Sequence, residues 1–358
     1  MFLSPKNFLS AITFPKRKPQ GAFFATLPKS GTDFIDNTLM AVAGLQLPKV
    51  YRDANTLTEI SSGSYSFEKP LIGVGNFDAQ FLNSKYLEIS RTRGDLVSTH
   101  ASASFFNIKA FEKARIDRLT VVMRDPRDAT VSLLHHISKG GQSQRNTIME
   151  FLFLPLDYFD WPKNLQLSHL VRTFLPKAVS WIESWFANLE RPITAINVNL
   201  QFHDELRQSS HDFIQQVIFH HDILNADLSS LPDKRQLGHF RSGQSRQYLS
   251  EFSQSDLEFS DRLIGNRITS AYRRAANAHF KRVTSEANTG DAFTQAYLAA
   301  RCFPNDLFVA ERTCEIFTKK HLGKATALKA DWMDWITEPN RESLDYPRDI
   351  INRLNELR

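Results

Sequence analysis

The fold of this chain is decided by one stretch, which reads Ala25-Thr26-Leu27-Pro28-Lys29-Ser30-Gly31-Thr32-Asp33-Phe34. The apolar run over 22–27 predicts a buried strand, and the apolar spacing over 35–42 predicts a helix. A turn between a strand and a helix gathers backbone amides at the helix N-terminus, where the helix dipole favours an anion. Lys29 adds a positive charge, and Gly31 allows the backbone to come close to a ligand. The stretch therefore predicts a phosphate-binding loop.

The rest of the chain alternates between strand and helix patterns. Apolar, β-branched runs predict strands over 94–100, 119–123 and 193–198, and helical spacings follow over 129–137, 174–189 and 213–224. This alternation predicts an α/β fold, with a mostly parallel central sheet and helices on both faces. Residues 49–90 and 139–165 show no clear period, and we interpret them as loops and short irregular pieces.

Three chemically active side chains come directly after predicted strands. Lys29 follows the first strand, His100 ends the second, and Arg124 follows the third. Ligands of such sheets bind at the carboxyl ends of the strands. We therefore expect these three side chains to converge on one site.

Two motifs resemble those of a known enzyme family. The common nucleotide triphosphatase loop, G-x-x-x-x-G-K-[ST], has Lys after its last Gly, whereas here Lys29 precedes Gly31. The order over 28–32 resembles the 5′-phosphosulfate loop of the sulfotransferases that use 3′-phosphoadenosine 5′-phosphosulfate (PAPS). The stretch 121–132 resembles the 3′-phosphate motif of that family, with Arg124 at a strand end and Ser132 eight residues later. An arginine offers a fork of donors to such a phosphate.

A third segment resembles the family in part. Its Gly-rich segment, Arg-Lys-Gly-x-x-Gly-Asp-Trp, would place Arg241, Ser242 and Gly243 over the 3′-phosphate. Ser242 replaces the Lys, Arg246 the second Gly, and Tyr248 the Trp.

The chain departs from the family at other positions as well. Ser98-Thr99-His100 stands where the family has Lys-Thr-His, so one cation is absent near the transferring group. Asp33 stands in place of a second Thr, and Phe34 in place of a Trp that stacks on adenine. The residues Asn-Val-Asn-Leu at 197–200 replace Tyr-Glu-Asp-Leu after the expected fourth strand. The resemblance spans about residues 20–265.

The resemblance implies transfer of a sulfuryl group from PAPS to a hydroxyl, or less readily to an amine, with 3′,5′-adenosine diphosphate as product and no metal. His100 would be the catalytic base, and Lys29 would neutralise charge on the leaving oxygen. The expected cofactor-binding residues are Lys29, Ser30, Gly31, Thr32, Asp33, Phe34, Arg124, Ser132, Arg241, Ser242 and Gly243. The acceptor would be a small molecule or a glycan, bound by loops over 49–90 and 139–170.

Composition limits the other classes of protein. The 358 residues carry a net charge of +5, which suits an anionic ligand and is too diffuse to indicate nucleic acid. The two cysteines, Cys302 and Cys314, indicate neither a disulfide framework nor a zinc site. No apolar stretch reaches about 18 residues, so no membrane span is expected. These observations predict a soluble, cytoplasmic protein.

We expect three regions: an irregular lead-in over 1–20, the sulfotransferase-like α/β domain over 21–285, and an all-α C-terminal extension over 290–358. The Ala-rich pattern of the extension resembles a tetratricopeptide helix pair, although a plain helical tail fits as well. Its helices would offer a surface to a protein partner.

Two other functions fit the sequence. One is a nucleotide-binding or protein-interaction module in which the chemistry is impaired, a reading that Asp33, Ser98 and the divergent Gly-rich segment favour. The other is a P-loop kinase, which the position of Lys29 and the lack of a magnesium-binding Asp after a strand disfavour.

Overall fold

A computed structural model describes residues 21–47, 82–139, 154–223, 226–231 and 246–265, with shorter pieces between 267 and 278. The lead-in, the larger part of both insertions and the C-terminal extension lie outside these residues, as do Arg241, Ser242 and Gly243. The domain boundaries therefore stay predictions.

Four parallel strands form the central sheet, in the order β2-β1-β3-β4. The strands are β1 (Ala22–Thr26), β2 (Leu96–Thr99), β3 (Arg118–Met123) and β4 (Asn197–Phe202). All five residues of β1 are buried, as expected for a strand covered on both faces. The predicted α/β class is confirmed. Because the strands are parallel, their carboxyl ends meet at one edge.

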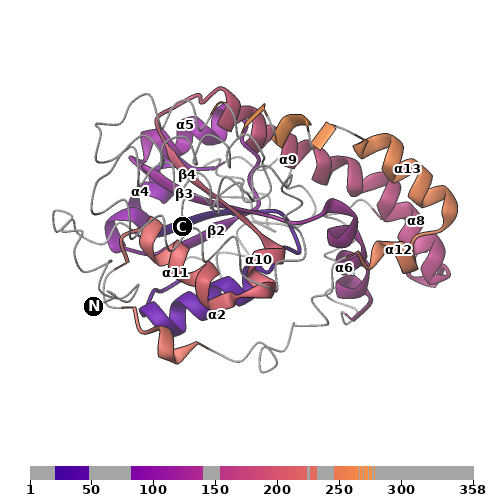
Figure 1. Ribbon diagram of the computed structural model, residues 1–358, viewed down its shortest axis with the longest axis horizontal. Helices are drawn as coiled ribbons and strands as arrows, with labels where there is room; N and C mark the ends of the chain where they lie inside the picture. The colour runs from indigo at the N-terminus through magenta and orange to yellow at the C-terminus, as the bar shows by residue number, and fades with distance from the viewer. Residues whose placement is uncertain are drawn as a thin grey trace, which may run out of the picture.

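Helices cover both faces of the sheet (Figure 1). On one face α2 (Thr32–Ala43), α10 (His203–Gln208) and α11 (Ser210–His220) enclose a core with Phe24 and Val122 of the strands. The opposite face has a larger core, which includes Phe23 and Val121. Its helices are α4 (Ser84–Arg93), α5 (Phe105–Lys113), α6 (Pro126–Lys139), α8 (Lys163–Thr173), α9 (Leu175–Glu190), α12 (Tyr248–Glu251) and α13 (Gln254–Ile264).

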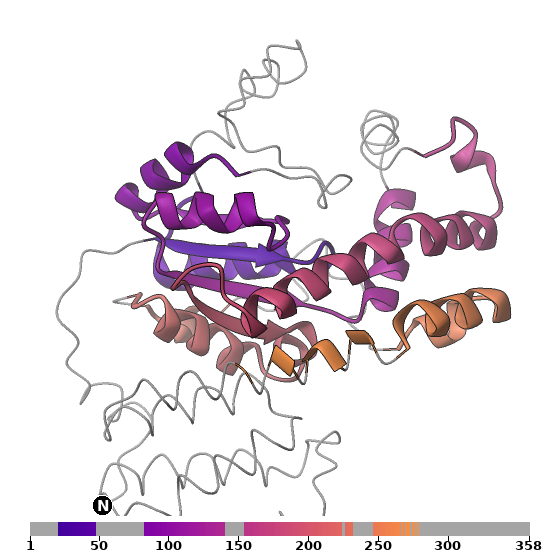
Figure 2. The ribbon, with the colours of Figure 1, turned by 90° about the horizontal axis from the view of Figure 1, so that it is seen from above.

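The view from above looks onto the sheet, so one layer of helices lies in front of the strands and the other behind them (Figure 2). Helices α6, α8, α12 and α13 gather beyond the carboxyl ends of the strands, where they pack on one another (Figure 1). Two short 3₁₀ turns, Tyr158–Asp160 and Leu228–Ser230, complete the described elements.

Residues 82–93 correct the interpretation of 49–90 as loops, because α4 begins at Ser84. The side chain of Asn83 caps this helix by accepting hydrogen bonds from the amides of Lys85 and Tyr86. Only Tyr86, Leu87 and Ser90 are buried, so the apolar spacing is too sparse to be read from the sequence. Helices α5 and α8 were also absent from the prediction, and α8 begins inside the predicted insertion 139–165.

The fourth strand lies four residues later than predicted, at Asn197–Phe202 instead of 193–198. The residues expected to follow the strand are part of it. Polar side chains that disfavour strands alternate here with Val198 and Leu200. They are accommodated because the Gln201 side-chain amide donates to Asn199 Oδ1 at 3.1 Å and to Gln216 Oε1 at 2.8 Å.

Two neighbouring histidines beside β3 predict an acid-sensitive fold. Burial and the charge of Arg118 lower the pKa of His220 to about 4, and burial, the neighbouring His220 and Arg118 lower that of His221. The unfolded chain, with ordinary imidazole pKa values, binds more protons between pH 6.5 and 4. The free energy of unfolding is therefore expected to fall as the pH drops through this window. Each histidine contributes a loss of up to about 1.4 kcal/mol per pH unit.

Urea unfolding at pH 7 and pH 5 measures this loss. His220→Gln should reduce the difference between the two pH values, whereas His211→Gln, which changes an exposed histidine of the same helix, should leave it unchanged. An equal pH dependence in the wild type and in His220→Gln would contradict the assignment.

Candidate functional site

The loop between β1 and α2 has the backbone of an anion-binding nest. Lys29 (φ 69°) and Gly31 (φ 95°) both have left-handed backbone conformations, which are typical of such nests. Gly31 is the N-cap residue of α2, and its position carries no side-chain cap. The first amides of a helix have no acceptor in their own helix. This helix end therefore offers uncapped donors at the edge where the strands end.

The Ser30 hydroxyl lies inside this loop and has no hydrogen-bonding partner in the part of the chain that the structure describes. Ser30 is 0% exposed, and among the described residues its Oγ meets no hydrogen-bonding group. A buried polar group without a partner costs about 1–3 kcal/mol. A ligand oxygen in the loop would supply the missing acceptor, so the loop fits the phosphate that the sequence predicts.

Arg124 connects the two predicted phosphate motifs. It follows β3, which pairs with β1, and its Nη1 donates to the Lys29 carbonyl at 2.8 Å. Burial lowers the pKa of the Lys29 amine, the charge of Arg124 lowers it further, and Asp33 opposes both effects. Two cationic side chains from separate motifs thus meet at one loop.

His100 lies at the end of β2, next to the loop. Its Nδ1 donates to the Thr26 carbonyl at 2.8 Å. Since a carbonyl only accepts hydrogen bonds, Nδ1 carries the proton, and Nε2 of the neutral ring keeps its lone pair. Burial lowers the pKa of His100, and the charge of Lys29 lowers it further. The hydrogen bond to the Thr26 carbonyl and the charge of Asp33 raise it. The imidazole is therefore neutral near pH 7 and able to accept a proton.

Two tryptophans of α9 hold the backbone of this region, and the sequence analysis did not identify them as site residues. Trp181 Nε1 donates to the His100 carbonyl at 2.9 Å, and Trp185 Nε1 donates to the Ala101 carbonyl at 3.3 Å. Both side chains are fully buried. Their helix was predicted from its apolar spacing, but a spacing does not reveal which carbonyl an indole reaches.

Thr26 was also missed, although it contacts both the base and the loop. Its hydroxyl lies 2.8 Å from Thr32 Oγ1 and 3.2 Å from His100 Nδ1, and its carbonyl accepts from the same ring nitrogen. It is the last residue of β1 and is completely buried. A polar residue that ends an otherwise apolar strand is the signal that could have identified it.

Ser98, which replaces the family's lysine, is paired with a carboxyl group. Its Oγ donates to Asp36 Oδ1 at 2.5 Å. Burial raises the pKa of Asp36 to about 7, the bond from Ser98 lowers it, and the charge of Asp33 raises it. The Asp36 carboxyl group is therefore partly protonated at neutral pH. Asp33 itself is exposed, which lets its carboxylate turn away from a bound anion.

The remaining predicted residues differ in their settings. Phe34 packs against the core on the α2 side of the sheet, so part of its ring is not available to an adenine. Ser132 lies in α6 and is partly exposed. Lys29, Ser30, Gly31, Thr32, His100 and Arg124 lie together at the sheet edge.

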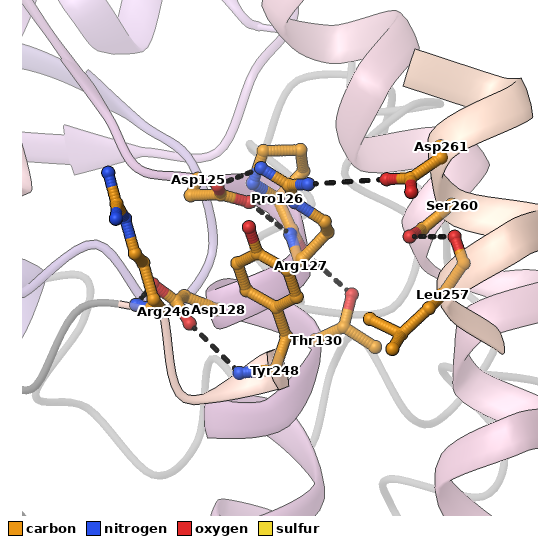
Figure 3. Close-up of polar contacts among 10 residues, drawn as sticks. All are labelled: Asp125, Pro126, Arg127, Asp128, Thr130, Arg246, Tyr248, Leu257, Ser260 and Asp261. Carbon is orange, nitrogen blue, oxygen red and sulfur yellow. Dashed lines mark hydrogen bonds and ion pairs between the residues drawn. The ribbon is translucent and has the colours of Figure 1, made fainter. Parts of the chain in front are cut away.

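The N-terminus of α6 holds the chain that returns after residue 245 (Figure 3). Asp128 accepts hydrogen bonds from the amides of Arg246 at 2.7 Å and Tyr248 at 3.4 Å. The Arg127 guanidinium lies 4.0 Å from the centre of the Tyr248 ring and forms two hydrogen bonds to Asp125. Residues 246–248, which end the segment that resembles the Gly-rich motif, therefore lie beside the N-terminus of α6, within the stretch that resembles the 3′-phosphate motif.

Among the described residues, no group of three or more histidine, cysteine or acidic side chains could hold a metal ion. In the same part of the chain, every helix is too short or too polar to cross a membrane.

No family model and no curated protein matches this sequence. Among solved structures, mouse sulfotransferase SULT7A1 complexed with PAP is similar over 77% of this chain and 94% of that chain, with 14% sequence identity and a TM-score of 0.41. A likeness this distant does not bear on function, which we infer from the site.

Proposed function

We propose that this protein is a sulfotransferase that transfers a sulfuryl group from PAPS to a hydroxyl acceptor, or less readily to an amine. One observation carries the proposal: Arg124 is hydrogen-bonded to the Lys29 carbonyl of the loop. The contact supports the proposal because it joins the residues that would bind the 5′-phosphosulfate to one that would bind the 3′-phosphate.

The loop residues would bind the 5′-phosphosulfate. The amides at the start of α2 and the unpartnered Ser30 hydroxyl would donate to its oxygens, and Lys29 would offset the negative charge that grows on the leaving oxygen. Arg124 and Ser132 would bind the 3′-phosphate, and we expect Arg241, Ser242 and Gly243 to cover it. That contact would distinguish PAPS from ATP.

His100 would act as the general base. As the acceptor oxygen attacks sulfur, the bond from sulfur to the bridging phosphate oxygen breaks, and 3′,5′-adenosine diphosphate leaves with the electron pair. The acceptor proton moves to Nε2 of His100. Because Nδ1 is held by the Thr26 carbonyl, the ring keeps the orientation and tautomer that this transfer needs.

Calorimetric binding of 3′,5′-adenosine diphosphate, 5′-AMP and ATP with Mg²⁺ tests the proposal. The wild type is expected to bind 3′,5′-adenosine diphosphate at least about tenfold more tightly than 5′-AMP, because a charged hydrogen bond contributes about 1.5–3 kcal/mol. Arg124→Ala should lower the ratio of the two affinities at least about tenfold. Both affinities should also fall, since the variant releases the Lys29 carbonyl.

Equal wild-type affinities for 3′,5′-adenosine diphosphate and 5′-AMP would overturn the PAPS assignment. Arg262→Ala, which removes an exposed arginine of α13, is the matched control and should keep the wild-type ratio.

A second function, nucleotide binding without efficient chemistry, is favoured by the pair of Ser98 and Asp36. A carboxyl group here takes the place of a cation near the transferring group. Tight binding of 3′,5′-adenosine diphosphate, with no turnover of PAPS across a panel of phenols, sugars and lipids, would favour this second function.

A further inference from the structure

Arg246 has a backbone conformation that is unusual for its residue type. Its φ of 61° is in the left-handed region, which a residue with a Cβ seldom adopts. Among the described residues, three other non-glycine residues share this property, and one of them is Lys29 of the phosphate loop. A strained residue of this kind points to a local constraint with a use.

The constraint on Arg246 is the side chain of Asp128. This carboxylate is 4% exposed, and its two oxygens accept from the amides of Arg246 and Tyr248. On the far side of the segment, Arg127 lies over the Tyr248 ring and is fixed by Asp125 (Figure 3). The backbone at 246–248 is therefore held against the first turn of α6.

The side chain of Arg246 is left available by this arrangement. It is exposed, and its guanidinium meets no acceptor among the described residues. In Figure 3 it extends away from the cluster of Arg127, Tyr248 and Asp125. The Asp128 carboxylate is occupied by backbone amides, so the strained backbone does not serve an ion pair with Asp128.

Arg246 also lies near the predicted 3′-phosphate residue Arg124. Arg124 lies four residues before Asp128, which is in the first turn of α6. Burial has the larger effect and raises the pKa of that carboxyl group, whereas the charge of Arg124 lowers it. Arg246 is attached to the same carboxylate through its amide. The backbone of Arg246 and the residue Arg124 therefore both lie beside the N-terminus of α6, where the helix dipole favours an anion.

We propose that Arg246 is a further phosphate-binding residue, whose guanidinium joins Arg124 on the 3′-phosphate of the nucleotide. Asp128 is the positioning residue that fixes its backbone. This inference rests on the proposed function and adds to it a residue that stands where the resembling motif has a glycine. A glycine would adopt this backbone without strain but would supply no guanidinium group.

The test compares Arg246→Ala with Arg262→Ala, which removes the same charge from an exposed site on α13. The readout is the ratio of the calorimetric affinities for 3′,5′-adenosine diphosphate and 5′-AMP. Arg246→Ala is expected to lower this ratio at least about tenfold, and Arg262→Ala by less than twofold. Arg246→Lys should recover part of the ratio, because the charge remains but the fork of donors is lost.

Arg246→Gly separates binding from folding. It relieves the strained backbone, so the melting temperature should not fall, yet the affinity ratio should drop as in Arg246→Ala. Asp128→Asn keeps one acceptor and should lower the ratio less than Arg246→Ala does.

A wild-type ratio in Arg246→Ala, together with a collapsed ratio in Arg124→Ala, would overturn this inference and leave the proposed function intact. A wild type that does not discriminate between the two nucleotides would overturn both.

Discussion

Replacement of His100 by alanine is expected to lower the rate of sulfuryl transfer by about 10²–10⁴-fold, while the affinity for 3′,5′-adenosine diphosphate stays nearly unchanged. The effect is on the rate because His100 Nδ1 is held by the Thr26 carbonyl, which leaves Nε2 for the acceptor proton. The measurement is the release of 3′,5′-adenosine diphosphate from PAPS with the best acceptor of the panel, alongside calorimetry.

His211→Ala is the matched control, because it removes an exposed histidine of α11 that contacts the side chain of Asp212. This variant should keep the wild-type rate. A parallel loss of rate and of nucleotide affinity in His100→Ala would instead identify His100 as a structural residue that supports the loop through Thr26.

Gly31→Ala is expected to weaken the binding of 3′,5′-adenosine diphosphate by about tenfold or more. The φ of 95° lies beyond the left-handed region that alanine tolerates, and an added Cβ would come within 2.9 Å of Leu206 Cδ2. The loop backbone must therefore shift, and the amides that we propose bind the nucleotide would shift with it. Calorimetry measures the affinity, and thermal unfolding measures the stability.

Gly44→Ala provides the matched comparison at the other end of α2. Gly44 has a φ of 64°, and nothing lies within 4 Å of an added Cβ. This substitution should cost about 1 kcal/mol of stability from the left-handed backbone alone and leave nucleotide affinity unchanged. If both variants bound the nucleotide equally well, the backbone of the loop would not be what holds it.

The sequence allowed the central elements to be predicted because their signals are local. β1 and β3 are short apolar runs, and α2 has apolar residues at helical spacing and ends at Gly44. Helix α4 was missed because a cap from Asn83 and three buried side chains define it. β4 was misplaced because its polar residues are compensated by partners such as Gln216 in another element.

The candidate site was predictable to a similar extent. Lys29, His100 and Arg124 come after strands, and the parallel sheet brings strand ends together, so their convergence could be anticipated. The bond between Arg124 and the Lys29 carbonyl joins residues 95 positions apart, and Trp181 reaches the His100 carbonyl across 81. Contacts of this kind depend on the fold as a whole, so no pattern along the chain reveals them.

The position of β1 in the sheet has a consequence for the order in which the molecule assembles. β1 is the earliest strand in the chain, yet it pairs with β2, which starts at Leu96, and with β3, which starts at Arg118. Contacts between residues so distant in sequence form slowly, because a long loop must be closed before they stabilise the chain. The loop that follows β1, which we propose binds the nucleotide, is held in place only when these late contacts exist. A nucleotide would therefore bind only after the sheet is complete. By mass action, its binding would stabilise the strand pairs that form most slowly.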